Sequence, residues 1–330
     1  MPTDPPNLIY ALSGIQTPFR HLHNSATCLH KDFQTLSTKL NKSHPHKKDA
    51  LETPSGVPPD VPSEAKEEIE EKQIQERVNI GAHVVHETIR REGEDELKRP
   101  SSALAWSGLA AGLSMGFSLV AEGLLAAGLP RAPWATLISK LGYSVGFLIV
   151  VLGRQQLYTE TTLTAVLPLL SRRNMRTALS VLRLWGIVLL ANLVGTYLFA
   201  LAIGRVSIFS PQVHQMFAEV SSSSTVGGFW VVFARAVFAG WLIALMVWLL
   251  PGAESSRVSI IIIITYLIGL GGFNHVIAGS TKVLFLVVTG AETWSNFFLR
   301  FFLPTFLGNM AGGVSLVAFL GHAQVVAGND

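Results

Sequence analysis

The chain has 330 residues, of which 49% are hydrophobic and 14% are charged, and its mean hydropathy is +0.41. Ordinary soluble domains carry about 25% charged residues, so this composition excludes a typical soluble globular domain. The net charge of +3 is small and the basic residues are spread over loops, which argues against binding of nucleic acid. The single cysteine, Cys28, excludes an internal disulfide and a cysteine-based metal site. Apolar runs too long for barrel strands predict an all-α membrane protein.

The N-terminal part divides by composition into two segments ahead of the apolar runs. Residues 1–63 are rich in Pro, Ser, His, Lys and Thr, and we expect them to be disordered. Residues 64–99 combine mixed charges with apolar positions at roughly helical spacing, at Ile69, Ile74, Val78, Val85 and Ile89. This pattern predicts a charged cytosolic helix, which either stays solvated or packs beneath the membrane domain or on a neighbouring subunit. Residues 100–325 are expected to form a six-helix transmembrane domain, and residues 326–330 a short tail.

Six apolar segments follow one another in the membrane domain. They cover about Ala103–Leu125, Trp134–Leu170, Thr177–Ile203, Phe229–Leu250, Val258–Thr289 and Trp294–Leu320. Gly108, Gly112 and Gly116 form a ladder of small residues in the first segment, which favours close helix contact. The loop at residues 171–176 is the most basic one between spans, so we expect it, and with it both chain termini, on the cytoplasmic side.

The second and fifth segments are interrupted by polar residues near their middles, at residues 153–162 and 269–280. Each half of the domain therefore has three segments with the middle one broken, and an odd number of crossings makes the halves inverted repeats. Paired breaks of this kind indicate a binding site at the membrane midplane. Because an ionisable side chain at that depth is costly, we interpret His275 as the centre of a transport pathway.

Three short motifs carry a resemblance to a known family. Residues 272–278, Gly-Phe-Asn-His-Val-Ile-Ala, look like the fifth-helix signature of the formate/nitrite transporter family. Residues 157–159, Leu-Tyr-Thr, look like its second-helix loop, and Gly308, Asn309, Gly312 and Gly313 look like its sixth-helix motif. Within the family, the chain most resembles the branch typified by the bacterial inner-membrane protein YfdC.

The resemblance implies an aquaporin-like protomer, five protomers in a ring and one pore in each, in a bacterial inner membrane. It also implies a channel or proton-coupled carrier for small monovalent anions such as formate or nitrite, with no cofactor and no metal. The pore or substrate residues that it implies are His275, Thr159, Asn274, Leu157, Tyr158, Tyr143, Ile268 and Phe273. Arg154, Glu160 and Asn309 are accessory candidates. Ile268 stands where the family usually has an aromatic residue and Asn274 where it often has Glu, so the substrate stays open.

The chemistry of a small-anion pore explains why it would use an imidazole. A bare anion loses a large hydration free energy in a low-dielectric passage, whereas the neutral acid loses far less. An imidazole can donate a hydrogen bond or a proton to the anion, and half-helix N-termini add positive partial charge. The alternatives are structural, since His275 and Thr159 could serve helix contacts and the aromatic residues could serve packing. Lys282 either lines the pore or extends outward.

Three functions remain open from the sequence. The first is passive or proton-linked movement of a small monovalent anion, or its conjugate acid, across the lipid bilayer. The second is a pore for a small neutral solute. The third is a membrane scaffold whose cytosolic segment binds a partner. An intramembrane enzyme is the least favoured, because the sequence holds no zinc-type His-Glu-x-x-His motif and no catalytic Ser/His/Asp set.

Overall fold

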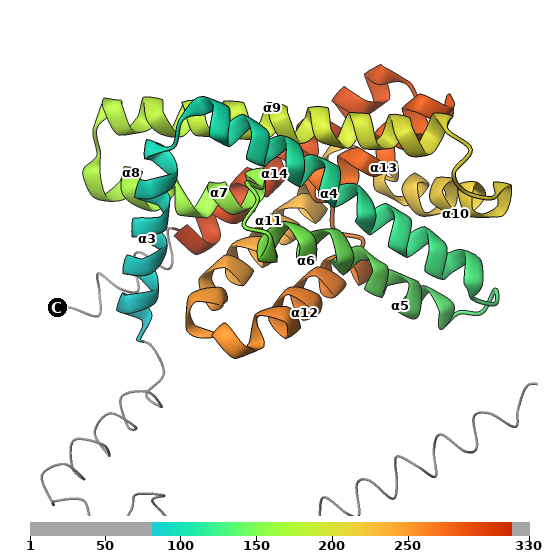
Figure 1. Ribbon diagram of the computed structural model, residues 1–330, viewed down its shortest axis with the longest axis horizontal. Helices are drawn as coiled ribbons and strands as arrows, with labels where there is room; N and C mark the ends of the chain where they lie inside the picture. Colours follow the sequence, from blue (N-terminus) through green and yellow to red (C-terminus); the bar gives the residue numbers. More distant parts are fainter. Residues whose placement is uncertain (1–80, 319–330) are drawn as a thin grey trace, which may run out of the picture. The chain divides into compact units, whose positions relative to one another are not determined.

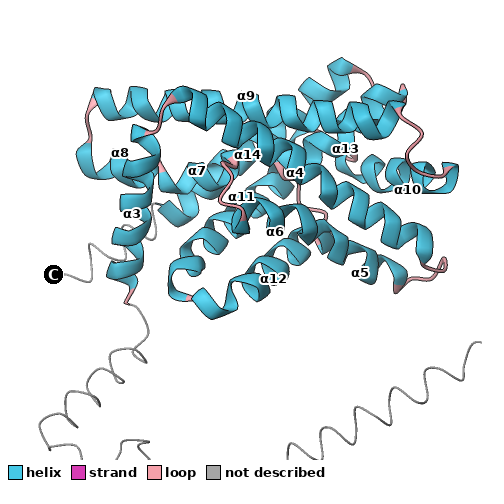
Figure 2. Ribbon diagram, in the orientation of Figure 1, coloured by secondary structure: helices cyan, strands magenta, loops and turns pink. Residues whose placement is uncertain are grey.

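The computed structural model describes residues 81–318 (Figure 1). The expectations for residues 1–63, for residues 64–80 of the charged segment and for the tail at 326–330 lie outside this range. Within it, every regular element is a helix (Figure 2), which confirms the all-α class.

Five helical segments of the described range are long and apolar enough to cross a membrane. They are Ser101–Gly128, Ala135–Leu152, Met175–Arg205, Phe229–Gly252 and Asn296–Ser315. The first, third and fourth contain α4 (Ser101–Gly128), α9 (Met175–Arg205) and α11 (Phe229–Leu249). The second consists of α5 (Ala135–Ser139), a 3₁₀ turn and α6 (Ser144–Leu152). The fifth joins a π-helical stretch, Asn296–Phe302, to α14 (Leu303–Met310) and a second π-helical stretch, Ala311–Ala318.

The two interrupted segments are broken where the sequence predicts. Between α6 and α7 (Tyr158–Thr164) the chain leaves helical geometry for five residues, and α8 (Val166–Arg172) follows α7. Between α12 (Arg257–Leu270) and α13 (Val276–Thr289) the second break also spans five residues. Arg154 and Gly272 occupy the same place in the two loops, and both have positive φ, 49° and 59°. Glycine adopts this conformation freely, whereas Arg154 adopts it at a cost in backbone strain.

The glycine ladder of α4 faces α9, as the spacing of its small residues predicts. A Cβ on Gly112 would lie 2.2 Å from the carbonyl oxygen of Asn192, and one on Gly116 would lie 2.1 Å from the ring of Phe199. The two helices therefore approach more closely than any larger residue allows. Figure 1 shows α9 running along α4. Gly240 of α11 approaches the backbone of α14 in the same way, with a Cβ–oxygen distance of 2.3 Å to Asn309.

Two amphipathic helices lie outside the long apolar segments. Helix α3 (Ala82–Lys98) packs on α7 and α8, where a Cβ on Gly93 would meet the carbonyl oxygen of Thr164. Helix α10 (Pro211–Ser222) lies in the connection between the third and fourth apolar segments, where the sequence analysis predicted no helix. It begins with Ser210, whose hydroxyl accepts a hydrogen bond from the Val213 N–H, and with proline at its first position. This serine–proline pair was a readable start signal for the missed helix.

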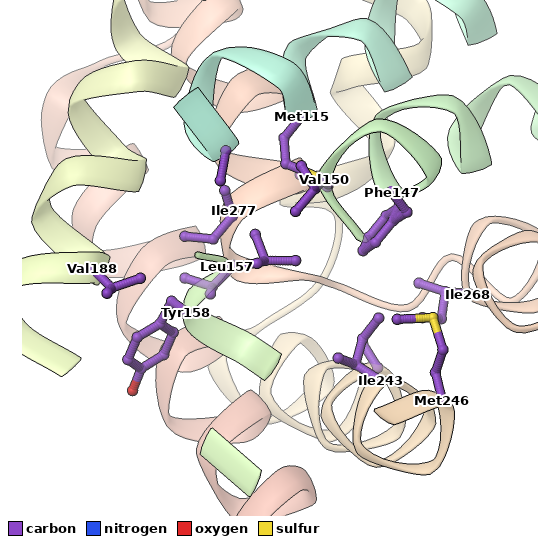
Figure 3. Close-up of a cluster of buried hydrophobic side chains, with 14 of the residues drawn as sticks. Met115, Phe147, Val150, Leu157, Tyr158, Val188, Ile243, Met246, Ile268 and Ile277 are labelled. Carbon is purple, nitrogen blue, oxygen red and sulfur yellow. The ribbon is translucent and has the colours of Figure 1, made fainter. Parts of the chain in front are cut away.

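The largest buried cluster surrounds both breaks. Figure 3 draws this cluster, to which α4, α6, α9, α11, α12 and α13 contribute side chains. Leu157 and Ile277, from the starts of the two half-helices, are fully buried in it. The residues of each break that lead into α7 and α13 are thus buried in protein, which is the condition under which irregular backbone survives at membrane depth. The first two residues of each break, at 153–154 and 271–272, are exposed.

Candidate functional site

The site is built around a contact between the two half-helices. His275 immediately precedes α13, and Thr159 is the second residue of α7. The Nε2 atom of His275 lies 2.7 Å from Oγ1 of Thr159, and each residue is only 1% exposed. The ring of Phe147 packs edge-on against the imidazole with centroids 5.0 Å apart. Residues 116 positions apart in the sequence therefore meet at one buried polar contact.

The hydrogen bonds of His275 define its protonation pattern. Nδ1 accepts a hydrogen bond of 3.2 Å from the backbone N–H of Ala278, so this nitrogen carries no proton in the neutral ring. The ring proton then lies on Nε2, which donates to Oγ1 of Thr159. The hydroxyl proton of Thr159 stays available to an acceptor in the passage. The pair can offer an anion one hydrogen bond while the imidazole remains neutral.

Two buried asparagines hold the starts of the half-helices with matching hydrogen bonds. Oδ1 of Asn192 accepts from the N–H of Tyr158 at 2.9 Å, and Oδ1 of Asn309 accepts from the N–H of Val276 at 2.8 Å. The amide nitrogen of Asn192 donates to the carbonyls of Gln156 and Gly108, and that of Asn309 donates to the carbonyls of Asn274 and Ala236. Each asparagine thus satisfies backbone groups that the break leaves unpaired.

The backbone at the two starts also matches. Leu157 precedes α7 with φ −101° and ψ 127°, and His275 precedes α13 with φ −105° and ψ 127°. The free backbone N–H groups of the first turn of each half-helix follow these residues, and the helix dipole places positive partial charge there. The sequence marked Asn309 as an accessory residue, but gave no sign that Asn192 performs the same task for α7.

A cavity of about 30 Å³ opens beside His275. Five of the predicted residues line it, namely Tyr143, Ile268, Phe273, Asn274 and His275. The other lining residues are Lys140, Ser223, Ser224, Gly269, Gly272, Gly279 and Lys282. The side-chain nitrogen of Asn274 is buried and has no hydrogen-bond partner within residues 81–318. A volume of this size holds roughly two waters or one small ion.

The remaining predicted residues lie outside this cavity. Leu157 and Tyr158 are buried in the cluster of Figure 3, where Tyr158 stacks on Phe306 with centroids 5.7 Å apart. Arg154 is exposed on its loop, and one carboxylate oxygen of Glu160 is buried without a partner. Neither residue is among those that line the cavity beside His275.

Sequence reasoning missed a group of charged residues at this cavity. Lys282, left open between two orientations, is turned inward and donates to Oε2 of Glu122 at 2.6 Å. Lys140 contacts the other oxygen of the same carboxylate. The signal for this network was a lone lysine and a lone glutamate in otherwise apolar spans, one in each half of the domain. No group of three or more His, Cys, Asp or Glu able to hold a metal ion occurs among residues 81–318.

Comparisons with known proteins agree with this architecture. The chain is 42% identical over 267 residues to the inner membrane protein YfdC of Escherichia coli (strain K12), covering 81% of this chain and 86% of that protein. The formate channel BtFdhC of Bacillus thuringiensis is 26% identical over 192 residues, which cover 56% of this chain and 73% of the channel.

Two solved structures show the same fold. A pentameric formate channel with formate bound superposes with a TM-score of 0.58 at 22% identity, covering 72% of this chain and 99% of that chain. An ion channel of the same family superposes with a TM-score of 0.61 at 19% identity, covering 74% and 98%. The family profile described as formate/nitrite transporter matches residues 83–323. The chain therefore belongs to the formate/nitrite transporter family, whose members are integral membrane transport proteins rather than enzymes.

Proposed function

We propose that this protein moves a small monovalent anion of the formate or nitrite type through a pore centred on His275 and Thr159. The observation that carries the proposal is the 2.7 Å contact between these side chains at the tips of two broken helices. Family membership and the similarity to BtFdhC support the substrate class. Proton transfer through the histidine belongs to the same proposal.

The passage would combine weak attraction with exclusion of water. The N-termini of α7 and α13 supply positive partial charge, and the hydroxyl of Thr159 supplies a hydrogen bond. Tyr143, Ile268 and Phe273 provide apolar walls beside His275. An anion crossing such walls loses hydration, and transient protonation lowers that cost because the neutral acid is far easier to desolvate. The Nε2 atom of His275, paired with Thr159, is the ring nitrogen that faces the proposed path. For it to give a proton to the anion, the ring must first take up a second proton on Nδ1, in place of the hydrogen bond from the Ala278 N–H, so that the donation leaves a neutral imidazole.

The architecture that we propose has six transmembrane segments in two inverted repeats. The matched asparagine networks support it, since Asn192 and Asn309 bind equivalent backbone groups in the two halves. Helices α12 and α13 together would make the fifth segment. We further propose a homopentamer, with both termini on the cytoplasmic side of a bacterial inner membrane. The pentameric formate channel and YfdC support these points by similarity. Native mass spectrometry giving five protomers would agree, and another number would contradict the assembly.

Uptake measurements on reconstituted protein test the function directly. Proteoliposomes should take up formate and nitrite faster than protein-free vesicles, and the panel should include acetate, chloride and thiocyanate at two pH values. A rate that rises at the lower pH with an inward proton gradient supports proton linkage. Rates equal to those of protein-free vesicles for every anion at both pH values contradict the proposal.

A pore for a neutral solute or an undissociated weak acid is the second candidate. The observation that favours it is the hydrogen bonding of His275, whose two nitrogens are both satisfied in the neutral ring. Ile268, completely buried and aliphatic, adds an apolar wall. Flux that follows the concentration of the neutral acid across pH and ignores membrane potential would favour this candidate. Dependence on membrane potential at constant pH would favour the anion.

The scaffold alternative depends on the free surface of segment 64–99. Within its described part, α3 is engaged by the chain's own membrane helices, since Glu96 accepts hydrogen bonds from Gln156 and Thr164. Arg183 of α9 also donates to the carbonyl oxygens of Leu97 and Arg99. These contacts favour a role for α3 in supporting the pore domain.

A further inference from the structure

Two lysines of distant elements share one buried carboxylate beside the cavity. Lys282 comes from α13, Lys140 from the turn after α5, and Glu122 from α4. The side chain of Glu122 is completely buried, and those of Lys282 and Lys140 are 6% and 17% exposed. The ammonium of Lys282 also lies 5.1 Å from the ring centre of Tyr143. Isolated charges at such depth are costly, so the network needs an account beyond packing.

The formal charges of the network do not cancel. Two ammonium groups and one carboxylate leave one net positive charge. Each ammonium has three donor hydrogens, and the structure gives each lysine one carboxylate contact. Donor capacity and charge therefore both remain after Glu122 is satisfied, in a region where a net charge attracts a counter-ion strongly.

Both lysines belong to the lining of the cavity that adjoins His275. Lys140 and Lys282 line it, whereas Glu122 is not among its lining residues. Asn274 lines it too, and its amide nitrogen is buried with no hydrogen-bond partner among residues 81–318. An unpaired buried donor costs free energy unless a ligand or water accepts from it. Three residues with side-chain nitrogen donors therefore line a space of about 30 Å³, which suits a small molecule that only accepts hydrogen bonds.

We propose that Lys282 and Asn274 form an anion-binding subsite next to His275, with Glu122 as the counter-charge. Lys140 completes the positive side, and Glu122 limits the site to one net positive charge. This charge suits a monovalent anion that must be held briefly and then released toward Thr159. The inference rests on the proposed function for its ligand class, and it assigns residues that the family motifs of this sequence do not include.

Two substitutions with opposite expected signs test the subsite. In Lys282→Met the subsite loses a charged donor, while Glu122 keeps Lys140 as its partner. In Glu122→Gln the subsite gains one net positive charge, and an amide of the same shape remains. Arg131→Met, an exposed arginine in the loop after α4, removes one charge without touching the cavity and serves as the control.

Binding is measured with ¹³C-formate by saturation-transfer NMR on detergent-solubilised full-length protein at constant ionic strength. Lys282→Met should weaken binding by about tenfold, which corresponds to about 1.4 kcal/mol, because the anion loses a hydrogen bond from a charged donor. Glu122→Gln should bind formate more tightly than wild type, and Arg131→Met should equal wild type. Should Lys282→Met not fold, as judged by gel filtration and melting, Lys282→Gln replaces it with the same expected direction.

The outcomes separate this inference from the proposed function. Equal weakening in both charge variants indicates a purely structural network and overturns the subsite, as does wild-type affinity in Lys282→Met. Formate binding that depends on Lys282 in a protein without anion uptake supports the subsite and contradicts the transport function. Anion uptake with wild-type formate binding in Lys282→Met supports transport and overturns the subsite.

Discussion

At the scale of single residues, the two nitrogens of His275 are differently constrained. Nδ1 is held by the N–H of Ala278, which also fixes the orientation of the ring at the start of α13. Nε2 faces Thr159 across the gap between the half-helices. In the structure the hydroxyl of Thr159 is the partner of the histidine. In the proposed mechanism the same hydroxyl would donate a hydrogen bond to an arriving anion.

Replacing Thr159 by valine keeps its shape and removes the hydroxyl. The buried Nε2–H of His275 then has no acceptor, which should cost about 1–3 kcal/mol of stability and lower anion uptake. Thr161→Val is the matched control, because the Thr161 hydroxyl bonds only to its own helix at the carbonyl of Tyr158. Uptake and melting temperature are measured for both. Wild-type uptake in Thr159→Val would remove this hydroxyl from the pathway.

At the scale of elements, the close helix contacts of the two halves occupy equivalent places. Gly112 lies against the backbone of Asn192, and Gly240 lies against that of Asn309. Because these asparagines hold the starts of α7 and α13, the glycines let each supporting helix reach its half-helix. Packing outside the pore thereby fixes the position of the Thr159–His275 contact.

Substituting alanine for Gly112 or Gly240 should lower the free energy of unfolding by about 1–3 kcal/mol, since each new methyl group overlaps a carbonyl oxygen. Gly186→Ala is the control, because a Cβ at Gly186 has no atom within 4 Å. The measurement is thermal unfolding in detergent. If all three variants had the same melting temperature, the close helix contacts at Gly112 and Gly240 would not contribute to stability.

The stability contributed by Glu96, which joins α3 to Gln156 and Thr164 by hydrogen bonds, should depend on pH. Burial raises the pKa of the Glu96 carboxyl above its ordinary value of 4.5, although hydrogen bonds from Thr164 and Gln156 lower it. The folded protein thus binds this proton more tightly than the unfolded chain. Its contribution to stability is complete below about pH 4.5 and is lost as pH rises through the raised pKa.

Glu96→Gln removes this titration while keeping an amide of the same shape. The melting temperature of the variant minus that of wild type should increase as pH rises from about 5 to about 8. Differential scanning fluorimetry across this range provides the measurement. A difference that stays constant with pH would show that the Glu96 carboxyl does not titrate differently in the folded state.

Much of the element pattern could be predicted because it depends on local composition. Apolar length gave the spans, and glycines with polar residues gave both breaks. Lys282 and Glu122 are 160 positions apart, so the sequence showed each as a lone charged residue in an apolar span but no local signal paired them. The equivalence of Asn192 to Asn309 could not be predicted either, because each asparagine binds backbone groups that are distant in the sequence. Helix α10 was missed because it is short and has only an amphipathic pattern to mark it.

At the scale of the whole molecule, the family fold carries charged side chains at the cavity beside His275. The chain matches a pentameric formate channel and an ion channel of the family in fold at about one-fifth identity. The cavity beside His275 is lined by two lysines and by Asn274, whose amide nitrogen has no hydrogen-bond partner in the described part of the chain. The account predicts that backbone geometry is shared across the family while anion preference is set by this cavity.

The central claim is that anions pass the histidine between the half-helices. The direct measurement is formate uptake into proteoliposomes by His275→Phe, with His214→Phe as a control that changes a histidine among the aromatic residues of α10 and α13. The account predicts that His275→Phe falls to the rate of protein-free vesicles while its oligomer elutes like wild type, and that His214→Phe keeps the wild-type rate. Uptake by His275→Phe at the wild-type rate would contradict it.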